Sequence, residues 1–253
     1  MKVTFLGTGT SQGVPVIGCD CQVCQSLDYR DKRLRSSVHL LINETSLVID
    51  TGPDFRQQML RERIQKLDAV LVTHQHKDHI AGLDDVRAYN YLQQKDMPVY
   101  GTRAVHKQLQ AEFHYAFDEH KYPGIPQLDL IEIGDQAFTI NHVTINPLPV
   151  LHYNLPVMGF RIEDFSYITD ANHIPESTFE KLRGTKVLVL NALQREKHLS
   201  HFNLSEALEI ASKVGAGQTY FIHISHKLGT HKSIEKELPV SVALAYDGLT
   251  IEL

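Results

Sequence analysis

Short apolar runs alternate along the chain with segments whose apolar residues recur at helical spacing. Apolar runs of four to eight residues bounded by turn residues predict buried strands, and apolar residues three and four apart predict helices. Predicted strands cover residues 2–7, 37–42, 46–50, 67–72, 97–101, 129–133, 136–140, 143–149, 157–162, 165–169, 186–191 and 219–224, with a β tail after 242–248. Predicted helices cover residues 55–66, 81–94, 104–117 and 201–214. This order predicts an α/β protein built as a four-layer αββα sandwich.

No repeat, low-complexity linker or evident domain boundary interrupts the pattern, so we expect residues 1–253 to form one domain. It carries a Cys-rich knuckle at about residues 18–26. Residues 118–128 contain two prolines and a glycine, which predict an irregular surface excursion near the substrate. The residues in or beside this excursion that could line a pocket are His114, His120 and Tyr122.

The chain has a formal net charge of −5 and no basic block. Tight binding to long nucleic acid is therefore not expected, whereas a small phosphorylated substrate needs only a few local charges. The N-terminus has no signal-peptide pattern, and no apolar run approaches the ~20 residues that span a bilayer. We therefore expect a cytoplasmic enzyme with no membrane partner, and a homodimer is compatible with the sequence.

Residues 73–79, Thr-His-Gln-His-Lys-Asp-His, join the predicted strand 67–72 to the predicted helix 81–94. Imidazole and carboxylate groups are ligands for Zn²⁺ and similar cations. Four such groups crowd this one turn, so we expect them to divide between two neighbouring ions, which together can activate a water. These residues are His74, His76, Asp78 and His79. A chance cluster of surface histidines is the alternative, because the chain has 15 histidines, but the complete H-x-H-x-D-H pattern favours metal binding.

Three cysteines, Cys19, Cys21 and Cys24, lie within six residues. An odd number at this spacing is a poor disulfide framework. Three thiolates need only a fourth ligand to complete a tetrahedral zinc site. The alternative is that they are buried reduced thiols acting as small apolar residues, but the polar surrounding sequence favours a metal.

The H-x-H-x-D-H motif resembles the signature of the metallo-β-lactamase superfamily of metallohydrolases, whose sandwich fold is the one predicted above. Downstream, His152, Asp170 and His223 stand at the ends of predicted strands, in the order His, Asp, His that the superfamily shows. The resemblance implies a first metal held by His74, His76 and His152. It implies a second metal held by Asp78, His79 and His223, with Asp170 bridging the two.

The same resemblance assigns further roles. A water or hydroxide bridging the two cations would be the nucleophile. Histidine at position 76 favours hydrolytic Zn²⁺ or Mn²⁺, because the redox di-iron members usually carry a carboxylate there. Asp78 is implied as a catalytic residue as well as a ligand. Asp50 matches an early aspartate that orients the ligands without binding metal itself, although an Asp before Gly52-Pro53 is equally a turn residue.

The Cys-x-Cys-x-x-Cys knuckle, with His226 three residues beyond His223, resembles the structural zinc site of the PhnP-type phosphodiesterases. That group acts on phosphoribosyl cyclic phosphate, which implies a small or cyclic phosphodiester as substrate. The resemblance extends from the Gly7–Ser11 stretch to Ala245–Gly248. It also matches His201 to an additional catalytic histidine, which could protonate the leaving oxygen or stabilise its charge. The implied cofactors are two divalent ions, Zn or Mn, in the active site and one structural Zn.

Two other functions stay open from the sequence. One is an RNA-processing nuclease similar to the tRNA 3′-end endonuclease, against which the absence of a long basic insertion argues. The other is a non-hydrolytic metalloprotein similar to PqqB, against which the complete ligand set argues. The Gly-rich turn 7–13 either cradles phosphate or is simply a tight turn. We interpret the histidines that match no ligand position as structural or surface residues: His39, His106, His114, His120, His142, His173, His198 and His231.

Overall fold

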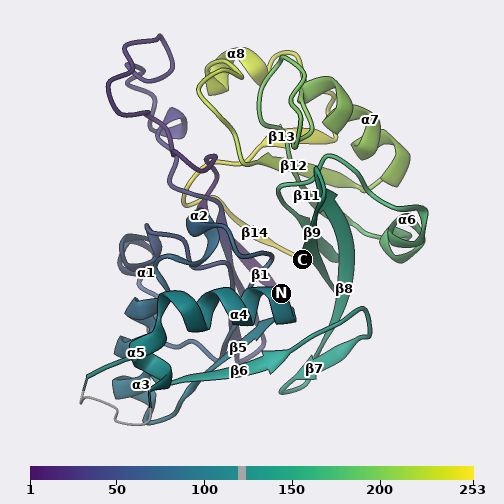
Figure 1. Cartoon of the computed structure of the whole chain (residues 1–253). Helices are drawn as coiled ribbons and strands as arrows, with labels where there is room; N and C mark the ends of the chain where they lie inside the picture. The colour runs from purple at the N-terminus through teal and green to yellow at the C-terminus, as the bar shows by residue number, and fades with distance from the viewer. Residues whose placement is uncertain (119–123) are drawn as a thin grey trace.

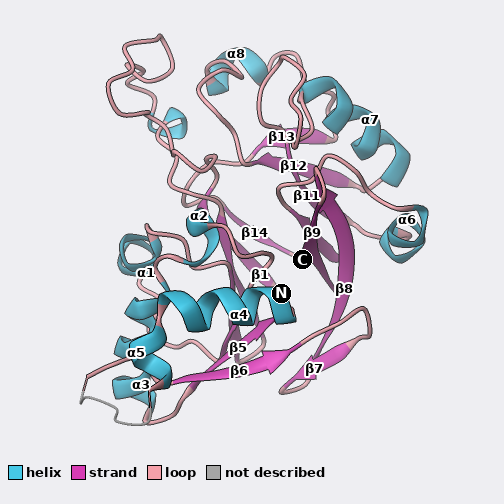
Figure 2. Ribbon diagram, viewed as in Figure 1, coloured by secondary structure: helices cyan, strands magenta, loops and turns pink. Residues whose placement is uncertain are grey.

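The computed structural model describes residues 1–118 and 124–253, and within them the strands pair into two seven-stranded sheets (Figures 1 and 2). The first sheet runs in the order β14 (Thr250–Glu252), β1 (Lys2–Gly7), β2 (Ser37–Ile42), β3 (Thr45–Ile49), β4 (Ala69–Leu71), β5 (Met97–Gly101) and β6 (Leu128–Glu132). The second runs in the order β13 (Val242–Leu244), β12 (Gln218–Ile222), β11 (Val187–Asn191), β10 (Phe165–Ile168), β9 (Leu155–Ile162), β8 (Val143–His152) and β7 (Phe138–Ile140).

Both sheets are mixed. In the first, β1 to β3 are antiparallel, and β3 to β6 are parallel. In the second, β7 to β10 are antiparallel, and β10 to β13 are parallel. Parallel strands need crossover connections, and helices on the outer faces supply most of them.

The helices lie outside the two sheets, which completes the predicted four layers (Figure 2). Those before the second sheet are η1 (Tyr29–Asp31), α1 (Phe55–Glu62), α2 (Lys77–Ile80), η2 (Leu83–Val86), α3 (Arg87–Gln93), α4 (Arg103–Glu112) and α5 (His114–Phe117). Those that follow are α6 (Glu176–Leu182), α7 (Leu204–Val214) and α8 (His231–Ile234). The described helices include none long and apolar enough to cross a membrane.

Alternating side chains on the strands explain why each sheet is covered on both faces. In β3, Leu47 and Ile49 belong to the core between the sheets, whereas Val48 packs on the helical side. In β4, Leu71 faces the central core and Val70 faces the helices. Since successive residues of a strand point to opposite faces, a strand buried on both sides is apolar throughout.

Most predicted elements form close to their expected bounds, and the differences have local causes. The helix predicted over 55–66 ends at Glu62, because Arg63 adopts a left-handed conformation (φ 53°). The helix predicted over 104–117 breaks at Phe113, whose backbone leaves the helical region (φ −107°, ψ 36°). α6 and α8 were not predicted, since they are short and interrupt polar stretches.

The predicted excursion 118–128 is described only in part, and residues 119–123, with His120 and Tyr122, lie outside the described residues. The part that follows lies against α3: the Asn90 side chain donates to the carbonyl of Gln127 and accepts from its N–H. Gly124 and Ile125 line a surface hollow with Tyr91 of the same helix. The described part of the excursion therefore contacts a helix, and His114 is exposed at the start of α5.

Candidate metal centre

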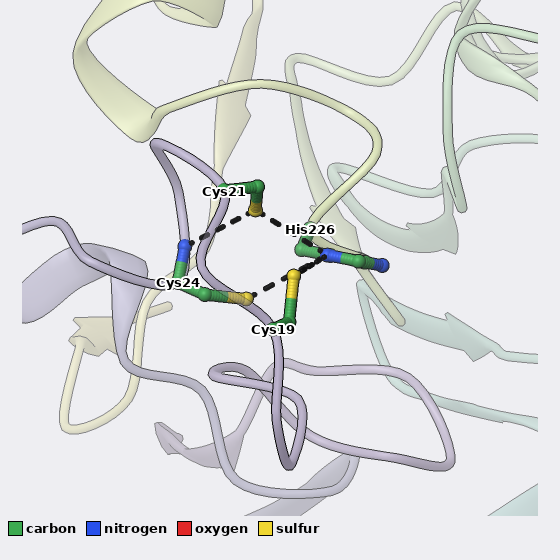
Figure 3. A group of neighbouring side chains, drawn as sticks. All are labelled: Cys19, Cys21, Cys24 and His226. Atoms are coloured by element: carbon green, nitrogen blue, oxygen red, sulfur yellow. Dashed lines mark hydrogen bonds between the residues drawn. The ribbon is translucent and has the colours of Figure 1, made fainter.

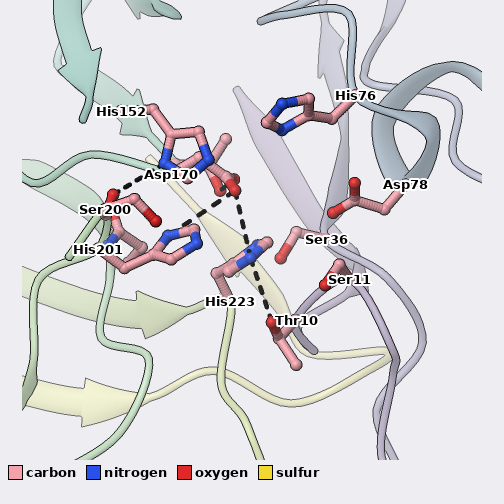
Figure 4. Close-up of polar contacts among 12 residues, drawn as sticks. Thr10, Ser11, Ser36, His76, Asp78, His152, Asp170, Ser200, His201 and His223 are labelled. Atoms are coloured by element: carbon pink, nitrogen blue, oxygen red, sulfur yellow. Dashed lines mark hydrogen bonds and ion pairs between the residues drawn. The ribbon is translucent and has the colours of Figure 1, made fainter. Parts of the chain in front are cut away.

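The predicted site residues gather at one edge of the sandwich, where strands of both sheets end (Figure 4). Asp50 directly follows β3, and the motif 73–79 follows β4. His152 is the last residue of β8, Asp170 follows β10, and His223 directly follows β12. Because loops at strand ends can converge while the strands stay rigid, this edge holds side chains that are far apart in the sequence.

Three of these strand-end residues have a left-handed backbone: Asp50 (φ 66°), Asp170 (φ 55°) and His223 (φ 54°). This conformation is uncommon outside glycine and costs of order 1–3 kcal/mol at each position. It turns the chain sharply out of the strand. Such backbone outliers concentrate at functional sites, where the surrounding structure maintains them.

His74 and His76 face each other through one nitrogen of each ring. The Thr73 hydroxyl donates to Asp50, so its oxygen can accept the Nδ1–H of His74 at 3.0 Å. The Nε2 lone pair of His74 then points at Nδ1 of His76, 3.0 Å away. Burial lowers the pKa of His74 well below its usual range, so the ring is the neutral form that binds metals.

His152 joins this pair from the other sheet. Its ring centre lies 5.8 Å from that of His74 and 5.2 Å from that of His76. Its Nδ1 donates to the backbone carbonyl of Ser200 at 2.8 Å, which leaves the lone pair on Nε2. A carbonyl on the far nitrogen is the usual way in which a protein orients a metal-binding histidine. The structure thus brings the predicted first ligand set together.

The side chains predicted to hold the second metal lie close together as well. One ligand atom from each of Asp78, His79, Asp170 and His223 lies within 4.8 Å of all the others. Nε2 of His79 is 3.1 Å from Asp78 and 3.2 Å from Asp170. Nε2 of His223 is 3.2 Å from the other oxygen of Asp170. These separations are close to the roughly 3.3 Å between neighbouring ligands of an ion bound at about 2.0–2.1 Å.

The charges of this group also fit a cation. Burial alone lowers the pKa of His79, but the carboxylates of Asp170, Asp50 and Asp78 outweigh burial and raise it well above its usual range. Three carboxylates around one buried imidazole form an excess of negative charge. Buried charges are stable when they are paired or coordinate metals, so a divalent ion suits this cluster.

Asp50 orients ligands of both sets. It is fully buried, and its Oδ2 accepts from Nδ1 of His79 at 2.7 Å. Its two oxygens also accept from the backbone N–H and hydroxyl of Thr73, each at 2.8 Å, and Thr73 in turn contacts His74. Asp50 thus connects the predicted ligands His79, directly, and His74, through Thr73, by hydrogen bonds.

His201 lies against the same cluster. Its Nδ1 is 3.8 Å from Oδ1 of Asp170, and its ring centre is 4.5 Å from that of His152. His152, Asp170 and His201 also form a compact group of candidate ligands. Burial lowers the pKa of His201 to about 3, so the ring is neutral in this environment. Nδ1 of His201 is buried and finds no hydrogen-bond partner within the described chain.

The three cysteines of the knuckle lie around His226 (Figure 3). Nδ1 of His226 lies 3.2 Å from Sγ of Cys19, 3.4 Å from that of Cys21 and 3.6 Å from that of Cys24. Tetrahedral zinc with Zn–S of about 2.3 Å and Zn–N of about 2.0–2.1 Å would separate these atoms by roughly 3.5 Å. The knuckle extends away from the sheets, at the upper left of Figure 1.

The pKa values of two of the thiols are shifted in opposite directions. The Cys24 N–H points at Sγ of Cys21 and lowers the pKa of Cys21 to about 6. Burial raises the pKa of Cys24 to about 11. A thiolate at Cys24 is therefore stable only beside a positive charge, as in a metal site.

Two glycines allow α2 to approach the first sheet closely. A Cβ at Gly52 would lie 2.1 Å from the carbonyl oxygen of Asp78, and a Cβ at Gly82 would lie 2.1 Å from that of Gly52. Gly7 and Gly9 have the same role in the Gly-rich turn, against the backbone of residues 33–35. Only Gly13 of that turn has a positive φ, 66°. Close packing thus accounts for most glycines of that turn.

Sequence reasoning missed several residues that complete the site. The hydroxyl of Thr10 lies 3.3 Å from Nε2 of His223, and Ser11 and Ser36 lie beside it (Figure 4). The Gly-rich turn was the one signal for Thr10. The Ser200 carbonyl left no signal, because any residue supplies a backbone carbonyl. Of the histidines interpreted as structural, His39 contacts Ser46 at 2.8 Å, and His198 lies beside His201.

A family model described as a β-lactamase superfamily domain matches residues 45–224. A curated relative from Porphyromonas gingivalis, named octanoyltransferase, is 38% identical over 98% of this chain and 51% of its own length. A ribonuclease Z from Staphylococcus epidermidis is 28% identical over 64% of this chain and 49% of its own length. The chain therefore spans about half the length of the curated relatives it matches.

Among solved structures, a diphosphatase described as a new member of the PhnP family is 40% identical, with a TM-score of 0.94 over 100% of this chain and 96% of that one. Zn²⁺-bound PqqB from Methylobacterium extorquens is 18% identical, with a TM-score of 0.80 over the whole of both chains. The short form of human tRNase Z is 17% identical, with a TM-score of 0.71 over 100% of this chain and 99% of that one. The last two share the fold alone.

Proposed function

The chain belongs to the metallo-β-lactamase superfamily, and from its site we propose that it is a dinuclear metal-dependent hydrolase of small or cyclic phosphodiesters. One observation carries the proposal. The carboxylate of Asp170 directs one oxygen to His79 and the other to His223, and it also neighbours His152 and His201. A carboxylate placed in this way suits a bridge between two ions.

The proposed ligands are those expected from the motif. His74, His76 and His152 would hold one ion. Asp78, His79 and His223 would hold the other, with Asp170 between the two sets. Zn²⁺ or Mn²⁺ suits these imidazole and carboxylate groups. When bound, two such ions would lower the pKa of a water and stabilise the charge that develops on the phosphate.

The protein residues around the ions supply orientation and hydrogen bonds. Asp50 and Ser200 hold the imidazoles of His79 and His152 in the tautomers that direct Nε2 into the site. His201, beside Asp170, is proposed to donate a hydrogen bond to a phosphate oxygen. The cluster Cys19, Cys21, Cys24 and His226 is proposed to hold a structural zinc ion.

The nearest alternative is an RNA-processing nuclease, because several curated relatives are named ribonuclease Z. The protruding segment between β1 and η1 bears on that choice. Residues 8–28 contain no lysine or arginine. A segment that grips RNA needs positive charge to bind the phosphate backbone, so this one favours a small substrate.

A metal-dependent substrate screen tests the proposal. Purified protein, loaded in turn with Zn²⁺ and Mn²⁺, is assayed on bis(p-nitrophenyl) phosphate, 1,2- and 2′,3′-cyclic phosphates, thioesters, lactones and a tRNA precursor. We expect hydrolysis of the small phosphodiesters, lost on chelation and restored by metal. Cleavage of the tRNA precursor alone would replace the proposal with the nuclease. Inactivity on every substrate with both metals bound would favour a non-hydrolytic role similar to PqqB.

A further inference from the structure

Three backbone N–H groups of the Gly-rich turn are already used inside the protein. Those of residues 8, 9 and 10 donate to Asp247, Leu34 and Ile224 at 2.9, 2.7 and 3.1 Å. The N–H of Ile224 returns a bond to the carbonyl of Thr8 at 3.0 Å. A phosphate cradle needs several free N–H groups, and these three are occupied. Residues 8–10 can therefore meet a phosphate only through a side chain.

The hydroxyl of Thr10 faces the atoms proposed to hold the second metal. Its oxygen lies 3.3 Å from Nε2 of His223, and that nitrogen lies 3.2 Å from Oδ1 of Asp170. Figure 4 shows the hydroxyl turned toward the ring of His223. These separations are close to the roughly 3.3 Å between neighbouring ligands of one ion. Thr10, which is 7% exposed, therefore borders the proposed second metal position.

Neighbouring rings hold the imidazole of His223 in place. It stacks with the rings of His79 and His201, at interplanar angles of 14° and 23°. Its Nδ1 is buried and finds no hydrogen-bond partner in the part of the chain that the structure describes. Nε2, beside Asp170, is therefore the nitrogen directed at the proposed metals. Because stacking holds the ring, the Thr10 hydroxyl is available for another role.

A cation bound at Nε2 of His223 would leave the Thr10 hydroxyl without an acceptor. Within residues 1–118 and 124–253, that nitrogen is the one partner of the hydroxyl at hydrogen-bonding distance. A nitrogen that binds a metal uses its lone pair for the metal and accepts no hydrogen bond. A buried donor without an acceptor is destabilising, so the hydroxyl requires another acceptor beside the metal.

We propose that the Thr10 hydroxyl donates a hydrogen bond to a phosphate oxygen of the substrate, beside the second metal set. This inference rests on the proposed function. A phosphate oxygen is a charged acceptor, and hydrogen bonds to charged groups are the stronger kind. Thr10 would act together with His201, which also lies against Asp170. The phosphate would then meet one donor from the turn after β1 and one from the segment between β11 and α7.

Calorimetry with inorganic phosphate tests the contact on the full chain with its metals bound. Thr10→Val keeps the shape of the side chain and removes the hydroxyl, whereas Thr10→Ser keeps the hydroxyl. Thr10→Ala is measured beside Thr10→Val, so that a folding defect in one variant does not decide the result. Thr139→Val, at an exposed residue of β7, makes the same change away from the site. Metal dissociation constants and the pH profile of kcat/KM with bis(p-nitrophenyl) phosphate are measured on the same samples.

We expect Thr10→Val and Thr10→Ala to weaken phosphate binding about tenfold, as for one lost hydrogen bond to a charged group, and to lower kcat/KM by a similar factor. Metal dissociation constants should stay within about twofold, and the pH profile should keep its shape. Thr10→Ser should recover most of the loss, and Thr139→Val should match the wild type.

Unchanged phosphate affinity in both variants would overturn the inference, and a shifted pH profile alongside it would place the contact at the activated water. A loss of metal affinity as large as the loss of phosphate affinity would make Thr10 a residue that positions His223, and would overturn it too. If the wild type hydrolyses no phosphodiester, the proposed function fails, and the phosphate affinities still decide the role of Thr10. If it binds no inorganic phosphate, the change in kcat/KM decides that role, and a wild type that does neither overturns both proposals.

Discussion

Among single residues, Asp170 is the point where the two proposed metal sets meet. It is 2% exposed and within 3.2 Å of both His79 and His223. Its left-handed backbone, at φ 55°, turns the carboxylate toward both partners. A change in this carboxylate should therefore affect both ions together, whereas a change in His201 should affect the reaction alone.

Asp170→Asn should abolish hydrolysis, because an amide cannot bridge two cations and leaves their repulsion uncompensated. Metal content, measured by mass spectrometry after dialysis, should fall at the two catalytic positions and stay intact at the cysteine knuckle. Unchanged metal content together with full activity would show that Asp170 does not bridge. Glu180→Gln, on the exposed surface of α6, is a matched carboxylate control.

His201→Ala should lower phosphodiester turnover about 10²–10⁴-fold, as expected for the loss of an acid or a charge-stabilising donor. Both catalytic metals should stay bound, and substrates with good leaving groups should show a smaller loss. Turnover and metal content are measured on the same samples. Loss of a metal ion from this variant would make His201 a ligand, a role that its group with His152 and Asp170 also permits.

At the scale of elements, the position of α2 depends on close backbone contacts. The N–H of Thr51 donates to the carbonyl of His79 at 2.8 Å, and the N–H of Gly82 donates to the carbonyl of Thr51 at 2.8 Å. These bonds hold the helix against the turn after β3. Two proposed ligands, Asp78 and His79, lie on this one short helix, so its position determines the geometry of the proposed second metal set.

Gly52→Ala should displace α2, because the new methyl group would lie 2.1 Å from the carbonyl oxygen of Asp78. We expect metal affinity to fall about tenfold or more, and thermal stability to drop, as in other overpacked sites. Gly134→Ala is the control, since its Cβ meets nothing within 4 Å. Metal titration and thermal unfolding measure both effects, and equal behaviour of the two variants would refute the contact.

The cysteine knuckle acts on the fold through the segment after β12. His226 follows His223 by three residues, so a metal bound at the knuckle would also restrain the chain beside a proposed catalytic ligand. Asp31 adds a second tie, since it accepts from the Ser26 hydroxyl and from the N–H of His231, each at 2.6 Å. The knuckle has few buried apolar residues of its own, and Val14, Val23 and Cys24 form most of its core.

Cys21→Ser should release one Zn²⁺ per chain and lower the midpoint of thermal unfolding, because small metal sites contribute their binding energy to folding. Turnover per dimetal-loaded molecule should fall only modestly. The double variant Cys21→Ser/His226→Ala should be no less stable than the less stable of the two single variants, because each single substitution already removes the same ion. An intact protein with two metals per chain and a freely alkylated Cys21 would show that the knuckle binds no metal.

Across the whole molecule, the proposed metals would connect the two sheets. His74, His76, Asp78 and His79 follow the first sheet, whereas His152, Asp170 and His223 belong to the second. Between the sheets, Phe5, Phe160 and Tyr167 lie in a core of buried apolar side chains. The core therefore aligns the strand ends, and the metals would stabilise that alignment further.

Removal of the catalytic metals should lower stability by about 2.7 kcal/mol for each site that was held at a hundredfold excess over its Kd. Hydrogen exchange should increase at the ends of β4, β10 and β12 and in α2, while the central core keeps its protection. Exchange measured by mass spectrometry, with and without chelator, separates these regions. Uniform exchange across both sheets would show that the metals do not act at this edge.

The sequence by itself determined the parts of the site whose chemistry is local. Metal binding is predicted from local spacing alone. The chain has four ligand-type residues on one strand-to-helix turn and three cysteines within six residues. The positions of most strands along the chain also followed from apolar runs, because strands buried on both faces are apolar throughout. Helix ends were less certain, and α4 stopped at Phe113 for reasons of backbone geometry that composition does not express.

The tertiary structure decided which atoms meet. Only the fold shows that Asp50 holds His79 directly and His74 through Thr73, or that a carbonyl at Ser200 orients His152. His198 reads as one more surface histidine until the fold places it beside His201. Ligand identity is a property of a side chain, whereas tautomer, bridging and donor direction depend on contacts between residues distant in sequence, and those contacts exist only after the sheets have packed.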